Sequence, residues 1–220
     1  MRARFWTATL LGLALPLLAA PEQPRAHPHV WVTVETKVLY GPERSIVGLR
    51  QKWVFDEFYS AFAAQGLDGD GDGKLSRKEL HPLAEENVSS LKDFGYFTFV
   101  KASGKAVERL DPRDYHLEHA DGILTLHFTL PLKTPLDARS SRVTFSVYDP
   151  TYFVAFSFAK ERPVTLATAA PKGCEPRMVG QKTANADVAR LGEAFFSQLD
   201  ATSDFGAQFA SSVAIHCPKS

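Results

Sequence analysis

The sequence predicts a mainly β protein, an antiparallel β-sandwich that carries a helix–loop–helix insert and a short C-terminal helix. Two observations lead to this prediction. Short stretches of alternating apolar and polar residues, typical of half-buried strands, recur along the chain and are separated by turn residues. After the second stretch, the apolar spacing changes to the i, i+3, i+4 pattern of an amphipathic helix. The helices therefore interrupt a β protein.

Residues 1–26 are expected to be a secretory signal peptide. Two arginines precede a run of about fourteen apolar residues, as in the n- and h-regions of a signal. The run is shorter than the roughly 20 residues that a membrane-spanning helix needs. We therefore expect a secreted protein with no stable membrane span after cleavage. Three cleavage positions remain open, after residue 19, 20 or 26. Only cleavage after residue 26 makes His27 the first residue of the mature chain.

The remaining chain divides into a sandwich over residues 27–163 and a C-terminal region over residues 164–220. Alternation predicts the first two strands at residues 29–40 and 46–54, followed by an insert at residues 55–92 with helices near Phe55–Phe62 and Arg77–Leu91. Further strands are expected at residues 96–101, 105–110, 115–120, 123–130, 141–148 and 152–158. The C-terminal region is expected to contain a tether rich in alanine and proline, a helix over about residues 185–199, and a last strand.

The dipeptide Asp121-Gly122 is the strongest hairpin signal in the chain. A two-residue turn there aligns His116 with His127 on the polar face and Leu117 with Leu126 on the apolar face. Glu118 then lies diagonal to both histidines. A solvated polar face is the simpler interpretation of this group, and a metal site is the alternative.

The segment DGDGDGKLSRKE, residues 68–79, matches the calcium-binding loop of an EF-hand. Calcium requires six to eight hard oxygen ligands, and Gly73 stands where such loops turn sharply. The predicted ligands are Asp68, Asp70, Asp72, the carbonyl of Lys74, Ser76 and a bidentate Glu79. Because calcium is abundant outside the cytosol and the loop is single, a structural role is favoured over a regulatory one. Pro82 predicts that the second helix is kinked or short.

His27 and His29 flank a proline in an extended segment, so both side chains are expected on the same polar face. Two imidazoles on one face form half of a site for zinc, nickel, cobalt or copper. If cleavage follows residue 26, the free amine of His27 adds a third nitrogen. Two exposed histidines without a metal are the alternative interpretation.

Cys174 and Cys217 are the two cysteines of the chain. In an oxidising compartment they are expected to form one disulfide, worth about 4 kcal/mol by the loop-closure model. Two separate buried thiols are the alternative. The 25 basic residues balance 25 acidic residues, which argues against a nucleic-acid partner.

Several further motifs occur in order along the chain: HPHVWV (27–32), KWVFDEFYSAF (52–62), ENVSSLKDFGYFTF (86–99), LHFTLPL (126–132) and VYDPTYFVAF (147–156). Together with the calcium-type loop, they resemble the bacterial family catalogued as domain of unknown function 1007. The resemblance implies a periplasmic component of an ABC-type transport system, associated with nickel, cobalt or zinc transport. It therefore implies a membrane metal transporter as partner and His27 and His29 as ligands. Asp56 and Asp149 lie in the matching motifs and are further candidate ligands.

The chain contains no nucleophile elbow, no HExxH motif and no glycine-rich phosphate loop, so an enzyme is not expected. The predicted function is a periplasmic metal-binding accessory component of a transport system, with Ca²⁺ in the insert and Zn²⁺, Ni²⁺ or Co²⁺ at the histidines. The alternative is a calcium-stabilised, secreted protein-interaction module without a transition-metal role.

Overall fold

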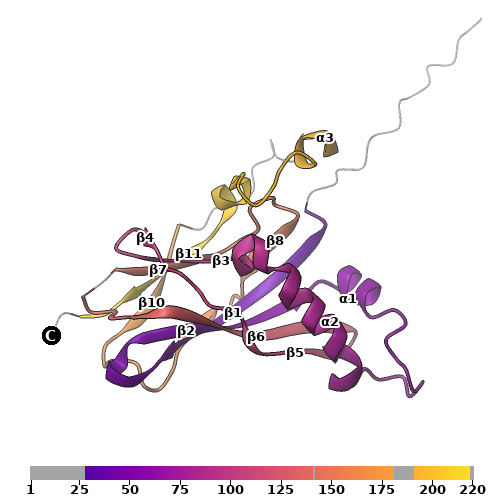
Figure 1. Cartoon of the computed structure of the whole chain (residues 1–220), viewed down its shortest axis with the longest axis horizontal. Coiled ribbons are helices and arrows are strands. Elements are labelled where there is room, and N and C mark those ends of the chain that lie inside the picture. Colours follow the sequence, from indigo (N-terminus) through magenta and orange to yellow (C-terminus); the bar gives the residue numbers. More distant parts are fainter. Residues whose placement is uncertain (1–27, 141, 181–190, 219–220) are drawn as a thin grey trace, which may run out of the picture.

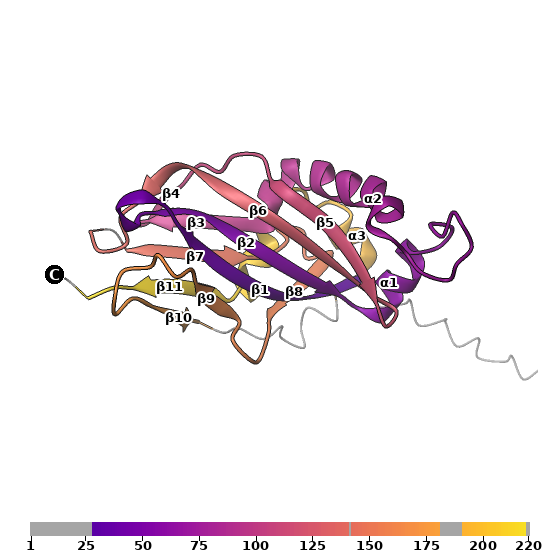
Figure 2. The same cartoon turned by 90° about the horizontal axis from the view of Figure 1, so that it is seen from below.

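The computed structural model describes residues 28–140, 142–180 and 191–218, which form two β-sheets with a helical insert (Figures 1 and 2). The expected signal peptide and His27 lie outside these residues. One sheet has six strands, in the order β5 (Arg113–Ala120), β6 (Ile123–Leu136), β2 (Ile46–Phe55), β1 (Val30–Tyr40) and β8 (Val154–Phe158), with β9 (Val164–Leu166) also paired to β1. The other has five strands, in the order β10 (Glu175–Val179), β11 (Ser212–His216), β7 (Val143–Val147), β3 (Thr98–Ala102) and β4 (Lys105–Ala106).

The two-sheet, mainly β architecture is confirmed, but the expectation of wholly antiparallel pairing was wrong. Strand β8 lies parallel to β1, with Val30 opposite Val154, and β9 is also parallel to β1, with Thr36 opposite Val164. The chain leaves β6 for β7 in the other sheet before it returns as β8. Alternation reports which face of a strand is buried and carries no information on strand direction.

The core lies between the two sheets. Along β1, buried and more exposed residues alternate, as the sequence pattern predicts. Trp53 of β2 is 2% exposed and packs edge-on against Phe128 of β6, with ring centroids 4.9 Å apart. A buried polar bridge joins the sheets, because Gln51 accepts from Thr36 Oγ1 at 2.7 Å and donates to Thr98 Oγ1 at 3.4 Å.

The insert consists of α1 (Glu57–Ala63), a loop, and α2 (Arg77–Ser90), and it packs against the six-stranded sheet (Figure 2). Helix α2 continues through Pro82 for 14 residues, so the expected shortening does not occur. Its residues Leu80, Ala84 and Val88 are buried in the same core cluster as Leu117 of β5. The 3-10 helix η2 (Lys92–Phe97) then leads into β3; η1 (Pro42–Arg44) joins β1 to β2.

The apolar stripe predicted for the first helix is only partly buried. Tyr59 and Ala63 pack against the core, whereas Phe58 is 88% exposed and Phe62 is 73% exposed. Phe55 belongs to β2 rather than to the helix and lies 4.6 Å from the ring of Tyr59. The helical spacing was therefore correct, but it did not identify the buried face.

The C-terminal region is more structured than the predicted tether. Strand β9 pairs with β1, and Ala167 and Ala170 pack against the core. The disulfide between Cys174 and Cys217 is present and joins the start of β10 to the end of β11. Helix α3 (Glu193–Phe196) and the 3-10 helix η4 (Phe205–Phe209) lie between these strands. Residues 181–190, which include the first part of the helix predicted at about residues 185–199, fall outside the described residues.

In the part of the chain that the structure describes, no helix is long and apolar enough to cross a membrane.

Candidate metal sites

The loop between α1 and α2 projects from one end of the molecule (Figures 1 and 2). Carboxylates of the loop residues close it by accepting hydrogen bonds from backbone N–H groups. Asp68 Oδ1 accepts from Gly71 N at 2.8 Å, and its Oδ2 accepts from Gly73 N at 2.9 Å. Both glycines have positive φ, 74° and 79°, a conformation that a residue with a Cβ rarely adopts. The glycines thus let the backbone turn its N–H groups toward Asp68.

Glu79 joins the two ends of this loop. Its Oε1 accepts from Gly69 N at 2.9 Å, and its Oε2 accepts from Ser76 N at 2.9 Å and from Ser76 Oγ at 2.7 Å. These hydrogen bonds, with the Ser76 hydroxyl first, lower the pKa of Glu79 to about 2. Ser76 Oγ in turn accepts from Glu79 N, which completes a capping box at the start of α2. Glu79 is therefore held as a carboxylate beside the loop.

Three of the six predicted calcium ligands converge. Carboxylate oxygens of Asp68, Asp70 and Glu79 all lie within 4.8 Å of one another. Asp72 is not part of this group; its Oδ1 accepts from Lys74 N at 2.7 Å. Hard carboxylate oxygens on a flexible loop are the donors that Ca²⁺ prefers. Leu75 packs against the core cluster and attaches the loop to the body of the protein.

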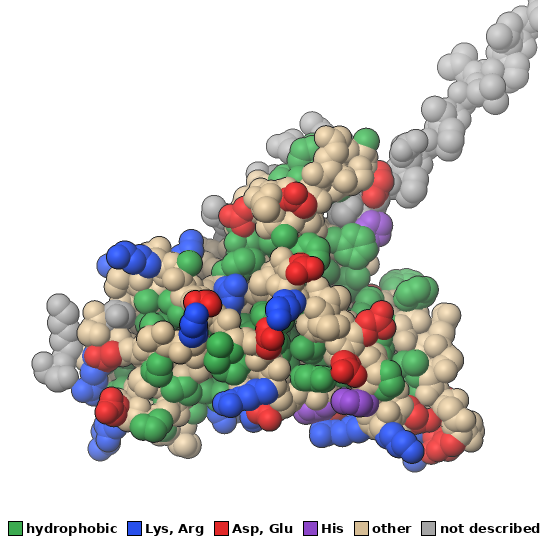
Figure 3. Space-filling model, viewed as in Figure 1, with side chains coloured by type: hydrophobic (Ala, Val, Ile, Leu, Met, Phe, Trp, Pro, Cys, Tyr) green, Lys and Arg blue, Asp and Glu red, His purple; other side chains and the backbone are tan. Residues whose placement is uncertain are grey.

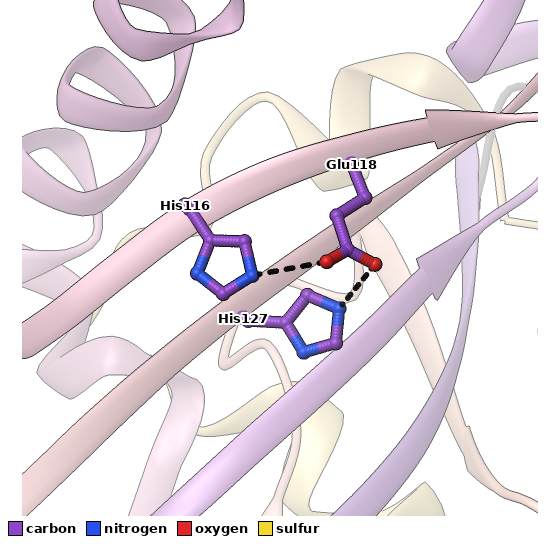
Figure 4. A group of neighbouring side chains, drawn as sticks. All are labelled: His116, Glu118 and His127. Carbon is purple, nitrogen blue, oxygen red and sulfur yellow. Dashed lines mark hydrogen bonds and ion pairs between the residues drawn. The ribbon is translucent and has the colours of Figure 1, made fainter. Parts of the chain in front are cut away.

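A second group of ligand-type side chains lies on the outer face of the β5–β6 hairpin (Figure 4). The predicted register is confirmed, with His116 opposite His127 and Leu117 opposite Leu126. The two imidazole rings are stacked, with centroids 4.7 Å apart and an interplanar angle of 8°. Glu118 Oε1 is 3.3 Å from His116 Nε2, and Glu118 Oε2 is 3.4 Å from His127 Nε2.

The two histidines differ in environment from a solvated surface pair. Burial lowers the pKa of His127, and the nearby charges of His116 and Lys52 lower it further, while Glu118 opposes the shift. His127 Nε2 is shielded from solvent and, although within ion-pair distance of Glu118, makes no hydrogen bond. Burying a ring nitrogen without a hydrogen bond costs folding free energy unless a ligand or an ion binds that nitrogen.

Arg77 is a member of this group that sequence reasoning missed. Its Nη2 donates to Glu118 Oε1 at 2.8 Å, and this hydrogen bond is the main cause of the lowered pKa of Glu118. Arg77 is the first residue of α2, which packs on the opposite face of the edge strand β5. Its contact with Glu118 depends on that docking, for which the sequence carries no local signal. In Figure 3, histidine side chains appear at the surface beside Lys and Arg side chains.

The other predicted transition-metal ligands are not brought together in the described residues. His29 stacks on Phe153, with ring centroids 4.6 Å apart. Asp56 caps α1 by accepting from Tyr59 N at 2.9 Å, and it also accepts from Trp31 N at 2.8 Å.

The carboxylate of Asp149 likewise accepts hydrogen bonds from backbone N–H groups of the turn that it begins. It is 2% exposed and accepts from Thr151 N and Val154 N. These bonds give Asp56 and Asp149 structural roles, at the start of a helix and in a turn before β8.

The described residues thus form a two-sheet, mainly β protein with a helical insert and two clusters of metal-type ligands. A family model described as "Protein of unknown function (DUF1007)" matches residues 12–217, and the chain belongs to this family. It is 35% identical over 99 residues to an uncharacterized 15.5 kDa protein of Spirochaeta aurantia, covering 45% of this chain and 70% of that protein. It is 23% identical over 194 residues to an uncharacterized protein of Haemophilus influenzae, covering 87% of this chain and 91% of that protein.

Proposed function

We propose that this protein is an exported metal-binding accessory protein that holds Ca²⁺ in an EF-hand-type loop and serves a membrane transporter of nickel, cobalt or zinc. The observation that carries the proposal is the convergence of Asp68, Asp70 and Glu79 on a loop closed by backbone N–H groups. Such a loop has the hard oxygen donors that Ca²⁺ prefers.

The role of Ca²⁺ in this proposal is structural. The loop joins α1 to α2, and both helices contact the six-stranded sheet. Calcium neutralises carboxylates that otherwise repel one another and thereby holds the insert on the sheet. Outside the cytosol a site with a Kd of about 10⁻⁴–10⁻³ M is sufficient, as in other extracellular modules.

The export and transport parts of the proposal rest on different observations. The basic, apolar N-terminal segment is typical of a secretory signal, and the Cys174–Cys217 disulfide suits an oxidising compartment such as the periplasm. The role with a nickel, cobalt or zinc transporter rests on the family resemblance and on the histidine-containing cluster of the hairpin.

Calcium binding is tested by thermal unfolding of the mature protein with Ca²⁺ and with EGTA. We expect Ca²⁺ to raise the Tm of the wild type, and Asp68→Ala and Glu79→Gln to remove this dependence. Glu85→Gln removes the same charge from an exposed position of α2, and we expect the Tm of this variant still to rise with Ca²⁺. A wild-type Tm that does not respond to Ca²⁺ would show that the loop has no structural calcium.

A second candidate function is a calcium-stabilised interaction module without a transition-metal role. The observation that favours it is the pair Phe58 and Phe62, one turn apart on α1 and both largely exposed. Tight binding to a membrane partner that is lost with EGTA and with Phe58→Ser, but kept when His27 and His29 are replaced, would favour this function.

A further inference from the structure

We propose that His116, Glu118 and His127 bind one divalent transition-metal ion on the outer face of the β5–β6 hairpin, and that Arg77 occupies Glu118 when the metal is absent. The inference rests on the proposed function and assigns its transition-metal site to residues other than His27 and His29. Two imidazoles and one carboxylate are a common ligand set for zinc and related ions.

The three side chains are already close to a binding geometry. Their ligand atoms lie within 4.8 Å of one another, and both imidazoles direct Nε2 toward the Glu118 carboxylate (Figure 4). Tetrahedral zinc sites with bonds of about 2.0–2.1 Å place neighbouring ligand atoms roughly 3.3 Å apart. Small side-chain rotations on adjacent, hydrogen-bonded strands would close the remaining distance without moving the backbone.

Two further features distinguish this group from an ordinary polar surface. His127 Nε2 is buried, and beyond its 3.4 Å contact with Glu118 Oε2 it makes no hydrogen bond, so a bound ion would satisfy it better than the present contact does. A β-bulge between Arg113 and His116 precedes the site, and Asp114 within it has a positive φ of 53°. Bulges often re-aim side chains next to functional sites.

The site also has room for an exchangeable ligand. A hollow of about 410 Å³ opens beside the two histidines. It is lined by Arg50, Arg77, Asp114, Tyr115, His116, His127 and Phe128. Three protein ligands leave a fourth coordination position open for water or for a donor atom of a partner. An open, half-exposed position suits an ion that is received and passed on rather than permanently held.

Arg77 competes directly with the ion. Its guanidinium donates to Glu118 Oε1, the same oxygen that faces His116. A divalent cation at the site would therefore displace Arg77 from Glu118. The ion pair is exposed, with side chains 66% and 47% accessible, so its loss weakens binding only modestly.

The test is Zn²⁺ binding to the calcium-saturated, full mature protein, measured by competition with a chromogenic chelator. We expect His116→Ala, His127→Ala and Glu118→Gln each to weaken the binding of one equivalent of Zn²⁺ by more than about 100-fold. Even the loss of an outer-shell partner of a metal ligand lowers metal affinity about 10–100-fold. His119→Ala, on the same hairpin but the opposite face, is the matched control and should bind as the wild type does. Visible absorption of bound Co²⁺ should report loss of imidazole ligands in the same variants.

Arg77→Gln supplies a gain-of-affinity test that does not depend on a destabilised variant. We expect it to tighten Zn²⁺ binding roughly two- to fivefold, the range of an exposed ion pair. Lys78→Gln makes the same charge change at the next residue and should have a smaller effect. An affinity that is unchanged or weaker in Arg77→Gln would contradict the competition.

The outcomes separate this inference from the proposed function. Zn²⁺ binding that survives in folded His116→Ala and His127→Ala but disappears in the His27→Ala, His29→Ala double variant would overturn the inference and keep the proposed function. A wild type that binds Ca²⁺ but no Zn²⁺, Ni²⁺ or Co²⁺ would overturn both the inference and the transport role.

Discussion

Glu118 connects three positively charged or chargeable groups on one face of the hairpin. It contacts Arg77, His116 and His127, and the Arg77 hydrogen bond is the main reason that its pKa is lowered. A carboxylate held in its charged form at this position can stabilise either a protonated imidazole or a metal ion. The lowered pKa of His127 disfavours the protonated imidazole, which leaves the neutral, metal-binding form.

The pKa of His127 gives a prediction at the residue scale. In the metal-free protein we expect the imidazole to titrate below its ordinary value of 6.5, mainly because burial disfavours the charged form. The unfolded chain then binds more protons than the folded protein between the two pKa values. The contribution of His127 to the free energy of unfolding is therefore fully present above pH 6.5. It is lost as the pH falls through the pKa of His127 in the folded protein.

NMR titration of the ring proton of His127, with urea unfolding at several pH values, measures both effects. Replacing His127 by Gln should remove its part of the pH dependence, and replacing the exposed His216 should not. A His127 pKa at or above 6.5 in the metal-free protein would contradict the role of burial.

The β5–β6 hairpin shows which residues of the candidate sites could be predicted from the sequence. The Asp121-Gly122 turn predicts the facing of His116 and His127, because a two-residue turn sets the register of the strands it joins. The contribution of Arg77 could not be predicted, since it depends on the docking of α2 against the edge strand. The calcium-type ligands were readable because they lie within twelve consecutive residues of a known motif.

At the scale of elements, one buried hydroxyl links α1 to β6 by a hydrogen bond. Ser60 is fully buried, and its Oγ accepts from the backbone N–H of Leu124 at 3.0 Å. Ser60→Ala would leave that N–H without a partner, so we expect the free energy of unfolding to fall by about 1–3 kcal/mol. Urea unfolding measures the change. Ser89→Ala on the exposed face of α2 is the control, and equal effects of the two would contradict this role.

Element positions were predicted better than their partners. The first two strands and α2 lie close to their predicted bounds, because period-2 and period-3.6 patterns are local properties of the chain. The parallel pairing of β8 and the exposure of Phe58 and Phe62 depend on tertiary arrangement. For the same reason, β9 was not recognised as a strand: it is short and is stabilised by pairing with β1.

At the scale of the whole molecule, the disulfide closes the C-terminal region. Cys174 and Cys217 are separated by 43 residues, a segment that includes β10, α3 and β11. Replacing both by Ala removes a constraint on the unfolded chain worth about 4 kcal/mol. We expect a lower midpoint of guanidinium unfolding, matched by reduction of the wild type. A midpoint unchanged by both treatments would show that the disulfide contributes nothing to stability.

The two candidate metal sites share the first turn of α2. Glu79 closes the calcium-type loop, and Arg77, two residues earlier, contacts Glu118 on the hairpin. The insert therefore touches both sites while its buried face packs on the sheet. This arrangement places a hard, oxygen-rich site and a softer, imidazole-containing site next to each other, with different metal preferences.

The most direct test of the central claim is a crystal structure of the mature protein grown with Ca²⁺ and Co²⁺, with anomalous data collected at the cobalt edge. We expect a cobalt peak between His116 Nε2, His127 Nε2 and Glu118, with Arg77 displaced, and calcium among Asp68, Asp70 and Glu79. A cobalt peak at the N-terminal histidines alone, or no metal at either cluster, would contradict that claim.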